Sequence, residues 1–255
     1  MEEVSLPLRG KVALVTGGSG AVGAAICRAL ATQGATVVVG FRNASEAANS
    51  LVATLCASQT QLHEAHRIDV ADSASLCELA NSLSGRFEHL DILVNCAGTT
   101  KYVPHADLVA LDDALIDSIL STNVRGVIAC TRAFQSLLER SGNGLIVNIS
   151  SIAARTGVGS NIAYCASKAA VDNLTLSLAR ALAPQIRVVS VSPGLVDTDF
   201  VKGMDPEWRA EQATRTPLGR LASTAEIADA VIACAIQLRF MTGAIIPMDG
   251  GRTLL

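Results

Sequence analysis

Tyr164 and Lys168 are two side chains capable of proton transfer, and they stand four residues apart. Residues at this spacing share a face of a helix, so a helical segment brings the phenol and the ammonium together. A free phenol gives up its proton reluctantly at neutral pH, whereas a neighbouring ammonium stabilises the phenolate. Ser151, at the end of an apolar run, adds a hydroxyl that can hold a substrate oxygen. The three residues predict proton transfer to or from an oxygen, although a YxxxK spacing also arises by chance around an ordinary tyrosine.

A glycine-rich stretch near the N-terminus, TGGSGAVG at residues 16–23, is a candidate phosphate-binding turn. It lies between a predicted strand at 11–16 and a predicted helix at 21–33. Glycines let the backbone approach a pyrophosphate, and the free N–H groups at a helix N-terminus bind its charge. The alternative is a tight turn without a ligand. The residues of this stretch predicted to bind a cofactor are Gly17, Ser19, Gly20, Val22 and Gly23.

The end of the second predicted strand, 36–39, distinguishes between the two nicotinamide dinucleotides. An NAD site usually has an acidic residue here for the ribose hydroxyls, whereas a 2′-phosphate requires a cation. This chain has no acid at Gly40 or Phe41, and Arg42 and Asn43 follow. We therefore predict NADP(H), with Arg42 on the 2′-phosphate and Asn43 or Ser45 assisting.

Apolar strands alternate with helical patterns along the whole chain. This alternation predicts an α/β fold in which right-handed crossovers build a doubly wound, Rossmann-like parallel sheet with helices on both faces. No linker is visible, so residues 1–255 are expected to form a single dinucleotide-binding and catalytic domain. Residues 197–216 are irregular and are predicted to be a substrate lid. The predicted strands are 11–16, 36–39, 62–68, 91–94, 144–149, 187–191 and 244–246, and the predicted helices are 21–33, 44–58, 73–85, 108–140 with a break near 121–123, 162–184 and 224–237.

Composition excludes several classes of function. Half of the residues are hydrophobic and 17% are charged, which suits strands buried on both faces. The net charge of −3 gives no footprint for nucleic acid. The seven cysteines form no cluster with metal-ligand spacing, and no apolar run is long enough to cross a bilayer. We expect a cytoplasmic protein without a metal site, a membrane span or a nucleic-acid partner.

Six motifs in order make the chain resemble the short-chain dehydrogenase/reductase family over nearly its full length, and most closely its 3-oxoacyl-[acyl-carrier-protein] reductases. They are the glycine turn, Asp69-Val70, the NCAG of residues 95–98, Asn123, the Ser151, Tyr164 and Lys168 set, and the SPG of 192–194 with Thr198. Met248-Asp249-Gly250-Gly251 adds a further match near the C-terminus. The chain departs from the family pattern at Ala21, where a glycine is usual, and at Cys96. The Ala21 methyl is expected to crowd the phosphate.

The resemblance implies a role for each matched residue. Tyr164 would be the general acid, Lys168 would support it and bind the ribose, and Ser151 would hold the substrate oxygen. Asn123 would anchor a water in the proton path, although an asparagine inside a helix also kinks it by bonding the backbone. Asp69 and Val70 would contact the adenine. The other residues implied to bind the cofactor are Asn95, Ala97, Gly98, Pro193, Gly194, Val196 and Thr198.

The resemblance also implies an activity and an assembly. We expect NADP(H)-dependent reduction of a ketone or 3-oxoacyl carbonyl to a secondary alcohol, with the substrate carried on acyl carrier protein or free in solution. A free small ketone, sugar or polyol is nearly as compatible with the residues. A non-enzymatic alternative is a dinucleotide-sensing or scaffolding protein. Relatives commonly form homotetramers through the two long helices, and we expect the same here.

Overall fold

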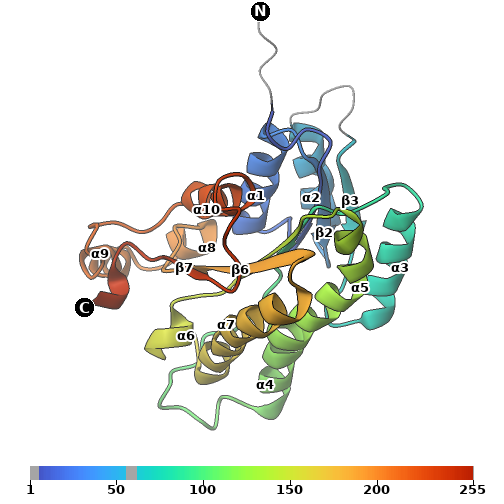
Figure 1. Cartoon of the computed structure of the whole chain (residues 1–255). Helices are drawn as coiled ribbons and strands as arrows, with labels where there is room; N and C mark the ends of the chain where they lie inside the picture. The colour runs from blue at the N-terminus through green and yellow to red at the C-terminus, as the bar shows by residue number, and fades with distance from the viewer. Residues whose placement is uncertain (1–5, 56–61, 255) are drawn as a thin grey trace, which may run out of the picture.

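Seven parallel strands form one sheet in the computed structural model, which describes residues 6–55 and 62–254 (Figure 1). The strand order is β3-β2-β1-β4-β5-β6-β7. The chain therefore winds outward from β1 in one direction, returns to β4, and winds outward in the other. The predicted doubly wound parallel sheet is confirmed. The strands are β1 (Val12–Thr16), β2 (Thr36–Phe41), β3 (Glu64–Arg67), β4 (Ile92–Asn95), β5 (Gly144–Ile149), β6 (Ile186–Pro193) and β7 (Ile245–Met248).

Helices cover both faces of this sheet, as predicted, with α1, α2 and α10 on one face and α3, α5 and α7 on the other (Figure 1). α10 begins with a capping box, in which Ser223 and Glu226 each satisfy the other's backbone N–H. The helices are α1 (Ala21–Thr32), α2 (Ser45–Thr54), α3 (Ser73–Ser84), α4 (Asp113–Leu120), α5 (Gly126–Arg140), α6 (Ala153–Thr156), α7 (Ile162–Leu182), α8 (Asp199–Lys202), α9 (Pro206–Thr214) and α10 (Thr224–Ile236), with a π-helical turn η1 (Ser121–Arg125) and a 3₁₀ turn η2 (Arg252–Leu254).

β1 shows why the strands appear in the sequence as continuous runs of apolar residues. Ala13 and Val15 pack into the core beneath α1 and α10, whereas Val12 and Leu14 pack into the core beneath α3 and α5. Because side chains alternate between the faces of a sheet, a strand covered on both sides needs apolar residues at every position. All five residues of β1 are buried.

The structure differs from the predicted elements at several boundaries. The long helix predicted at 108–140 begins only at Asp113, and the predicted break is the π-helical turn η1, which connects α4 to α5 without interruption. Residues 197–216 contain α8 and α9, so the predicted irregular loop is partly helical. α6 follows β5 and was not predicted, because four residues carry no periodic signal. The end of the helix predicted at 44–58 lies partly outside the described residues.

Candidate functional site

The turn between β1 and α1 opens a cleft at the carboxyl ends of the strands, where the winding of the sheet reverses. Gly17 has φ +65°, and a Cβ there would come within 2.9 Å of the Ala97 Cα. A Cβ on Gly23 would lie 2.3 Å from the Gly17 carbonyl oxygen, so both positions require glycine. Gly20 is the N-cap of α1 and no side chain caps it. The first N–H groups of α1 are therefore available to an anionic ligand.

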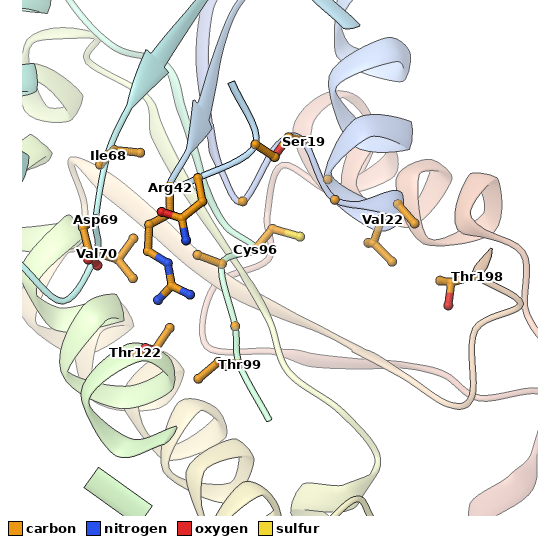
Figure 2. Close-up of a pocket in the computed structure, with 18 of the residues that line it drawn as sticks. Ser19, Val22, Arg42, Ile68, Asp69, Val70, Cys96, Thr99, Thr122 and Thr198 are labelled. Atoms are coloured by element: carbon orange, nitrogen blue, oxygen red, sulfur yellow. The ribbon is translucent and has the colours of Figure 1, made fainter. Parts of the chain in front are cut away.

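The cleft has a volume of about 700 Å³ and extends from this turn across the ends of β2, β3 and β4 (Figure 2). Twelve of the residues predicted to bind a cofactor line it, namely Gly17, Ser19, Gly20, Val22, Gly23, Arg42, Asn43, Asp69, Val70, Ala97, Gly98 and Thr198. Sequence reasoning missed other lining residues, which are Ala44, Ile68, Cys96, Thr99, Thr122 and Asp199. Ala21 also lines the cleft.

Arg42 follows the last residue of β2 and points into the cleft (Figure 2). Its backbone oxygen accepts a bond from Arg67 Nε at 3.3 Å, and its own guanidinium is exposed. Asp69 is the acid on this side of the cleft, and its Oδ1 already accepts a bond from the Ala71 N–H at 2.9 Å. The uncapped helix N-terminus and Arg42 thus provide two positive features, and this donor set fits a ligand with several phosphates.

Asn95, at the end of β4, lies behind the cleft and does not line it. Its Nδ2 donates to Asn148 Oδ1 at 2.9 Å, and Asn148 in turn donates to Thr175 Oγ1 at 2.9 Å. These bonds turn the amide of Asn95 into the interior of the sheet, where 5% of the residue is exposed. Asn95 therefore does not line the cleft, and its role in binding the cofactor stays a prediction. Thr16 Oγ1 fixes the next residues, because it accepts bonds from the N–H groups of Cys96 and Ala97 at 3.1 Å.

Asn161, which sequence reasoning missed, sets the start of the helix that carries the proton-transfer pair. It is the N-cap of α7, and its Oδ1 accepts a bond from the Tyr164 N–H at 2.7 Å. Its Nδ2 donates to the Lys101 carbonyl at 2.8 Å and to Thr100 Oγ1 at 3.2 Å. The polar asparagine after Ser160 is an N-cap signal that could have identified it. It ties Tyr164 to the loop that follows Gly98.

Lys168 lies beneath the cleft on the same side of α7 as Tyr164. Its Nζ is 5.7 Å from the centroid of the Tyr164 ring and donates to the Ile149 carbonyl oxygen at 2.8 Å. A Cβ on Gly98 would lie 3.8 Å from this nitrogen, so Lys168 also borders the floor of the cleft. Only 7% of Lys168 is exposed, so the ammonium acts in surroundings that screen its charge poorly.

Asn123 lies in the π-helical turn η1 and uses its whole side chain for bonds within the protein. Its Oδ1 accepts from the Thr99 N–H at 2.8 Å, and its Nδ2 donates to the Thr99 carbonyl at 3.1 Å and to Ser167 Oγ at 3.0 Å. Ser167 Oγ donates onward to the Tyr164 carbonyl at 2.7 Å. The side chain therefore braces the loop against α7. The role of Asn123 in anchoring a water stays a prediction.

Ser151 stands between β5 and α6, and its Oγ accepts a bond from the Ala153 N–H at 3.2 Å. Gly159 lies between this short helix and Tyr164, because a Cβ there would be 3.2 Å from both the Ala153 Cβ and the Tyr164 ring. The start of α6 and the phenol are thus packed around one glycine.

The end of β6 contributes the remaining predicted residues. The Pro193 carbonyl accepts from the Ile152 N–H at 2.9 Å, and the Gly194 N–H donates to the Met248 carbonyl at 3.0 Å. Val196 pairs with Ala222 in an isolated parallel bridge. These three residues hold the strand end in place and do not line the cleft, whereas Thr198 does.

Cys96 lines the cleft, and its surroundings affect its thiol. Burial raises the pKa of the Cys96 thiol to about 11, and the nearby charge of Lys168 lowers it by less, so the thiol stays protonated near neutral pH. No group of three potential metal ligands occurs among residues 6–55 and 62–254. In the same part of the chain, no helix is both long and apolar enough to cross a membrane.

The glycine turn, the parallel sheet and the cleft at the switch point define the Rossmann-like class of α/β proteins. A protein-family model described as enoyl-(acyl carrier protein) reductase matches residues 18–253. The chain belongs to the short-chain dehydrogenase/reductase family of oxidoreductases, whose members bind nicotinamide dinucleotides.

Curated relatives and solved structures resemble the chain over nearly its whole length. It is 38% identical to a cis-4-hydroxycyclohexanecarboxylate dehydrogenase of Sinomonas cyclohexanicum, covering 95% of this chain and 96% of the relative. It is 31% identical to a 3-oxoacyl-[acyl-carrier-protein] reductase of Thermotoga maritima, covering 96% and 98%. A gluconate 5-dehydrogenase from Burkholderia cenocepacia, solved with NADP and tartrate, superposes with a TM-score of 0.88 at 28% identity, covering 98% of each chain.

Proposed function

We propose that the chain reduces a ketone or 3-oxoacyl carbonyl to a secondary alcohol with NADPH, and that Tyr164 is the general acid. The observation that carries this proposal is the position of Lys168, whose Nζ lies 5.7 Å from the Tyr164 ring and borders Gly98 on the floor of the cleft. A buried ammonium beside a phenol stabilises the phenolate, which makes the phenol a better proton donor.

The roles of the three side chains follow from where charge develops. When bound, the dinucleotide supplies a hydride to the carbonyl carbon, and the carbonyl electron pair moves to the oxygen. Tyr164 gives that oxygen its proton, so a C–H bond and an O–H bond form together. Ser151 donates a hydrogen bond to the same oxygen, and Lys168 holds the resulting phenolate by its charge. In the oxidation direction, the phenolate takes the proton back.

The choice of NADP(H) rests on the end of β2. Arg42 points into the cleft, and none of Gly40, Phe41, Arg42, Asn43 or Ala44 is acidic. A 2′-phosphate placed there gains a charge-assisted bond from the guanidinium, with Asn43 beside it. Asp69 and Val70, which line the same end of the cleft, would flank the adenine.

The relatives suggest three substrate classes for the same chemistry. The Thermotoga reductase acts on a 3-oxoacyl group held by a carrier protein, the Sinomonas enzyme on a ring that carries a carboxylate, and the Burkholderia enzyme on gluconate. The substrate we propose is therefore either a carrier-bound acyl chain or a free ketone, sugar or polyol. Residues 197–216, with α8 and α9, would form a lid over that substrate, within the single domain proposed for residues 1–255.

The assembly we propose is a homotetramer built on α4, α5 and α7. Large apolar side chains are exposed on these helices, at Leu120, Ile128, Ile162 and Leu176. An apolar helix face left in water favours association with a second copy.

Turnover tests the proposal directly. The absorbance of NADPH should fall when the protein is mixed with a panel of ketones, 3-oxoacyl thioesters and keto sugars. Tyr164→Phe removes the proton donor and leaves the ring in place, so we expect at least a hundredfold lower kcat, the size of a general-acid contribution. Fluorescence titration with NADPH should give a similar affinity for the variant. No turnover with any carbonyl, in wild type and variant alike, would favour the sensing or scaffolding protein.

A further inference from the structure

A second cavity lies between α6, the end of α9 and the C-terminal turn η2, and arginines line it. Its volume is about 810 Å³. Arg155 comes from α6, Arg215 follows α9, and Arg252 begins η2. Among the described residues, no carboxylate lines this cavity. The other lining residues are Ile152, Thr156, Val158 and Thr253, so the walls combine three guanidinium groups, two hydroxyls and two apolar side chains.

The cavity adjoins the proposed reaction centre through α6. Arg155 follows Ser151 by four residues, and α6 begins at Ala153 between them. Ile152, which lines the cavity, is the residue directly after Ser151, and its N–H is held by the Pro193 carbonyl at 2.9 Å. On its other side, α6 packs around Gly159 against the Tyr164 ring. Ser151 and Arg155 thus lie at the two ends of one short segment of the chain, with the cavity at Arg155.

The arginines differ in how firmly they are held. Arg252 donates from Nη1 to the Gln212 carbonyl at 2.8 Å and to Thr216 Oγ1 at 3.4 Å, and from Nη2 to Gln212 Oε1. Arg215 is held only loosely, by Glu211 at 3.5 Å on the exposed surface. Arg155 makes no ion pair within the described part of the chain. Arg252 is thus preorganised by three bonds, Arg215 has one exposed ion pair, and the charge of Arg155 interacts with the buried Asp172 without forming an ion pair.

Like charges around one cavity repel each other in the absence of a counter-ion. Burial lowers the pKa of Arg252, and the charge of Arg215 lowers it further, whereas Glu211 opposes this effect. An anion placed among the three guanidinium groups removes this repulsion and gains charge-assisted hydrogen bonds.

We propose that this cavity binds a negatively charged group, carboxylate or phosphate, at the end of the substrate remote from its carbonyl. The proposal rests on the function proposed above and narrows its substrate to a free hydroxy or oxo acid, or a phosphorylated equivalent. Arg155 determines specificity, and Arg252 fixes one side of the site. The apolar side chains of Ile152 and Val158 contact the carbon skeleton between the two ends.

Matched probe pairs test the charge alone. In one pair, 4-oxocyclohexanecarboxylate is compared with 4-oxocyclohexanecarboxamide, which has the same shape and no charge. In the other, dihydroxyacetone phosphate is compared with dihydroxyacetone. We expect the wild type to favour the charged member of at least one pair by tenfold or more in kcat/KM, and the favoured pair identifies the anion.

Substitution then assigns the preference to the arginines. Arg155→Gln should lower the ratio of kcat/KM for the favoured anion to kcat/KM for its neutral partner by about tenfold, because one charge-assisted contact to the anion is lost. Arg155→Lys should restore part of the preference. Arg180→Gln, at an exposed arginine of α7 that does not line the cavity, is the matched control and should change neither value.

Binding measured without turnover separates the two proposals. Calorimetry should show the favoured anion binding to the wild type in the presence of oxidised NADP, and about tenfold more weakly to Arg155→Gln. Anion binding without reduction of any ketone would overturn the proposed function alone. Reduction of neutral and charged ketones at equal rates, unaffected by Arg155→Gln, would overturn this inference alone. The inference would also be overturned if Arg155→Gln changed the mass of the assembly measured by light scattering but left the substrate preference as in the wild type. The arginines would then hold subunits together and would not bind substrate.

Discussion

At the scale of single residues, the spacing of side chains predicted that Tyr164 and Lys168 lie close together. Tyr164 and Lys168 lie on one side of α7 because a four-residue spacing requires it. The hydrogen-bond partners of the Asn95 and Asn123 side chains were not predictable, because an amide bonds to whichever groups the fold places beside it. Asn148, 53 residues away from Asn95, turns that side chain into the sheet. The position of Thr99 and Thr122 in the cleft was also not predictable, because only the fold brings their segments close to β1.

Arg42 is the single residue that we predict to select between the two cofactors. Arg42→Ala removes the cation proposed to bind the 2′-phosphate. KM for NADPH should therefore rise by about ten- to a hundredfold, the effect of losing one or two charge-assisted hydrogen bonds. KM for NADH should change by less than about twofold, because NADH has no phosphate at this position. Initial rates with both cofactors measure this. An equal rise for both would show that Arg42 supports the cleft and does not select the cofactor.

At the scale of elements, long periodic segments were predictable and short ones were not. α1, α3 and α10 begin within a residue of their predicted starts, because each follows a turn or cap residue and carries an apolar face. α6 and α8 have four residues each, too few for a period to be visible. The break predicted near residues 121–123 is real in position, but a π-helical turn keeps the chain helical there. This turn packs against α7, an element from a distant part of the sequence, which no local pattern reveals.

Asp172, on α7, is expected to make the stability of the fold depend on pH. It is 8% exposed, and Ser190 Oγ donates to it at 3.4 Å. Burial raises its pKa, and a hydrogen bond from Ser150 and the charge of Arg155 lower it by less. A carboxyl whose pKa is raised by folding is most favourable when protonated, so its contribution to stability is present below its unfolded pKa of about 3.9 and is lost as pH rises through the folded value.

Replacing the charge with an amide should therefore stabilise the fold at neutral pH. Asp172→Asn is expected to raise the melting temperature at pH 7; in a chain of this size, each ~1 kcal/mol of stabilisation corresponds to about 2–4 °C. The gain should shrink as the pH becomes acidic, because the aspartic acid then becomes protonated and loses its charge. Thermal melts of both proteins between pH 4 and 8 measure it. A variant that melts lower than wild type by the same amount at every pH would show that Asp172 stabilises the helix as a hydrogen-bonding group and not through its charge.

At the scale of the whole molecule, the order of the sheet followed from the alternation of strands and helices. Right-handed crossovers leave few ways to arrange such a chain, and the reversal between β1 and β4 places the cleft where the glycine turn lies. The basic cavity was not predictable, because Arg155, Arg215 and Arg252 come from segments up to 97 residues apart. Only the closure of the C-terminal turn against α6 and α9 brings them together. Substrate choice is thus a property of the assembled chain.

The central claim is that this assembled site delivers hydride and proton to one carbonyl group, and the fate of a deuterium label tests it most directly. A carbonyl compound that the protein reduces is incubated with NADPH bearing deuterium on one face of nicotinamide C4, and the alcohol is analysed by mass spectrometry. We predict one deuterium on the carbinol carbon from one of the two labelled faces and none from the other. Alcohol that carries no deuterium with either labelled face would contradict direct hydride transfer.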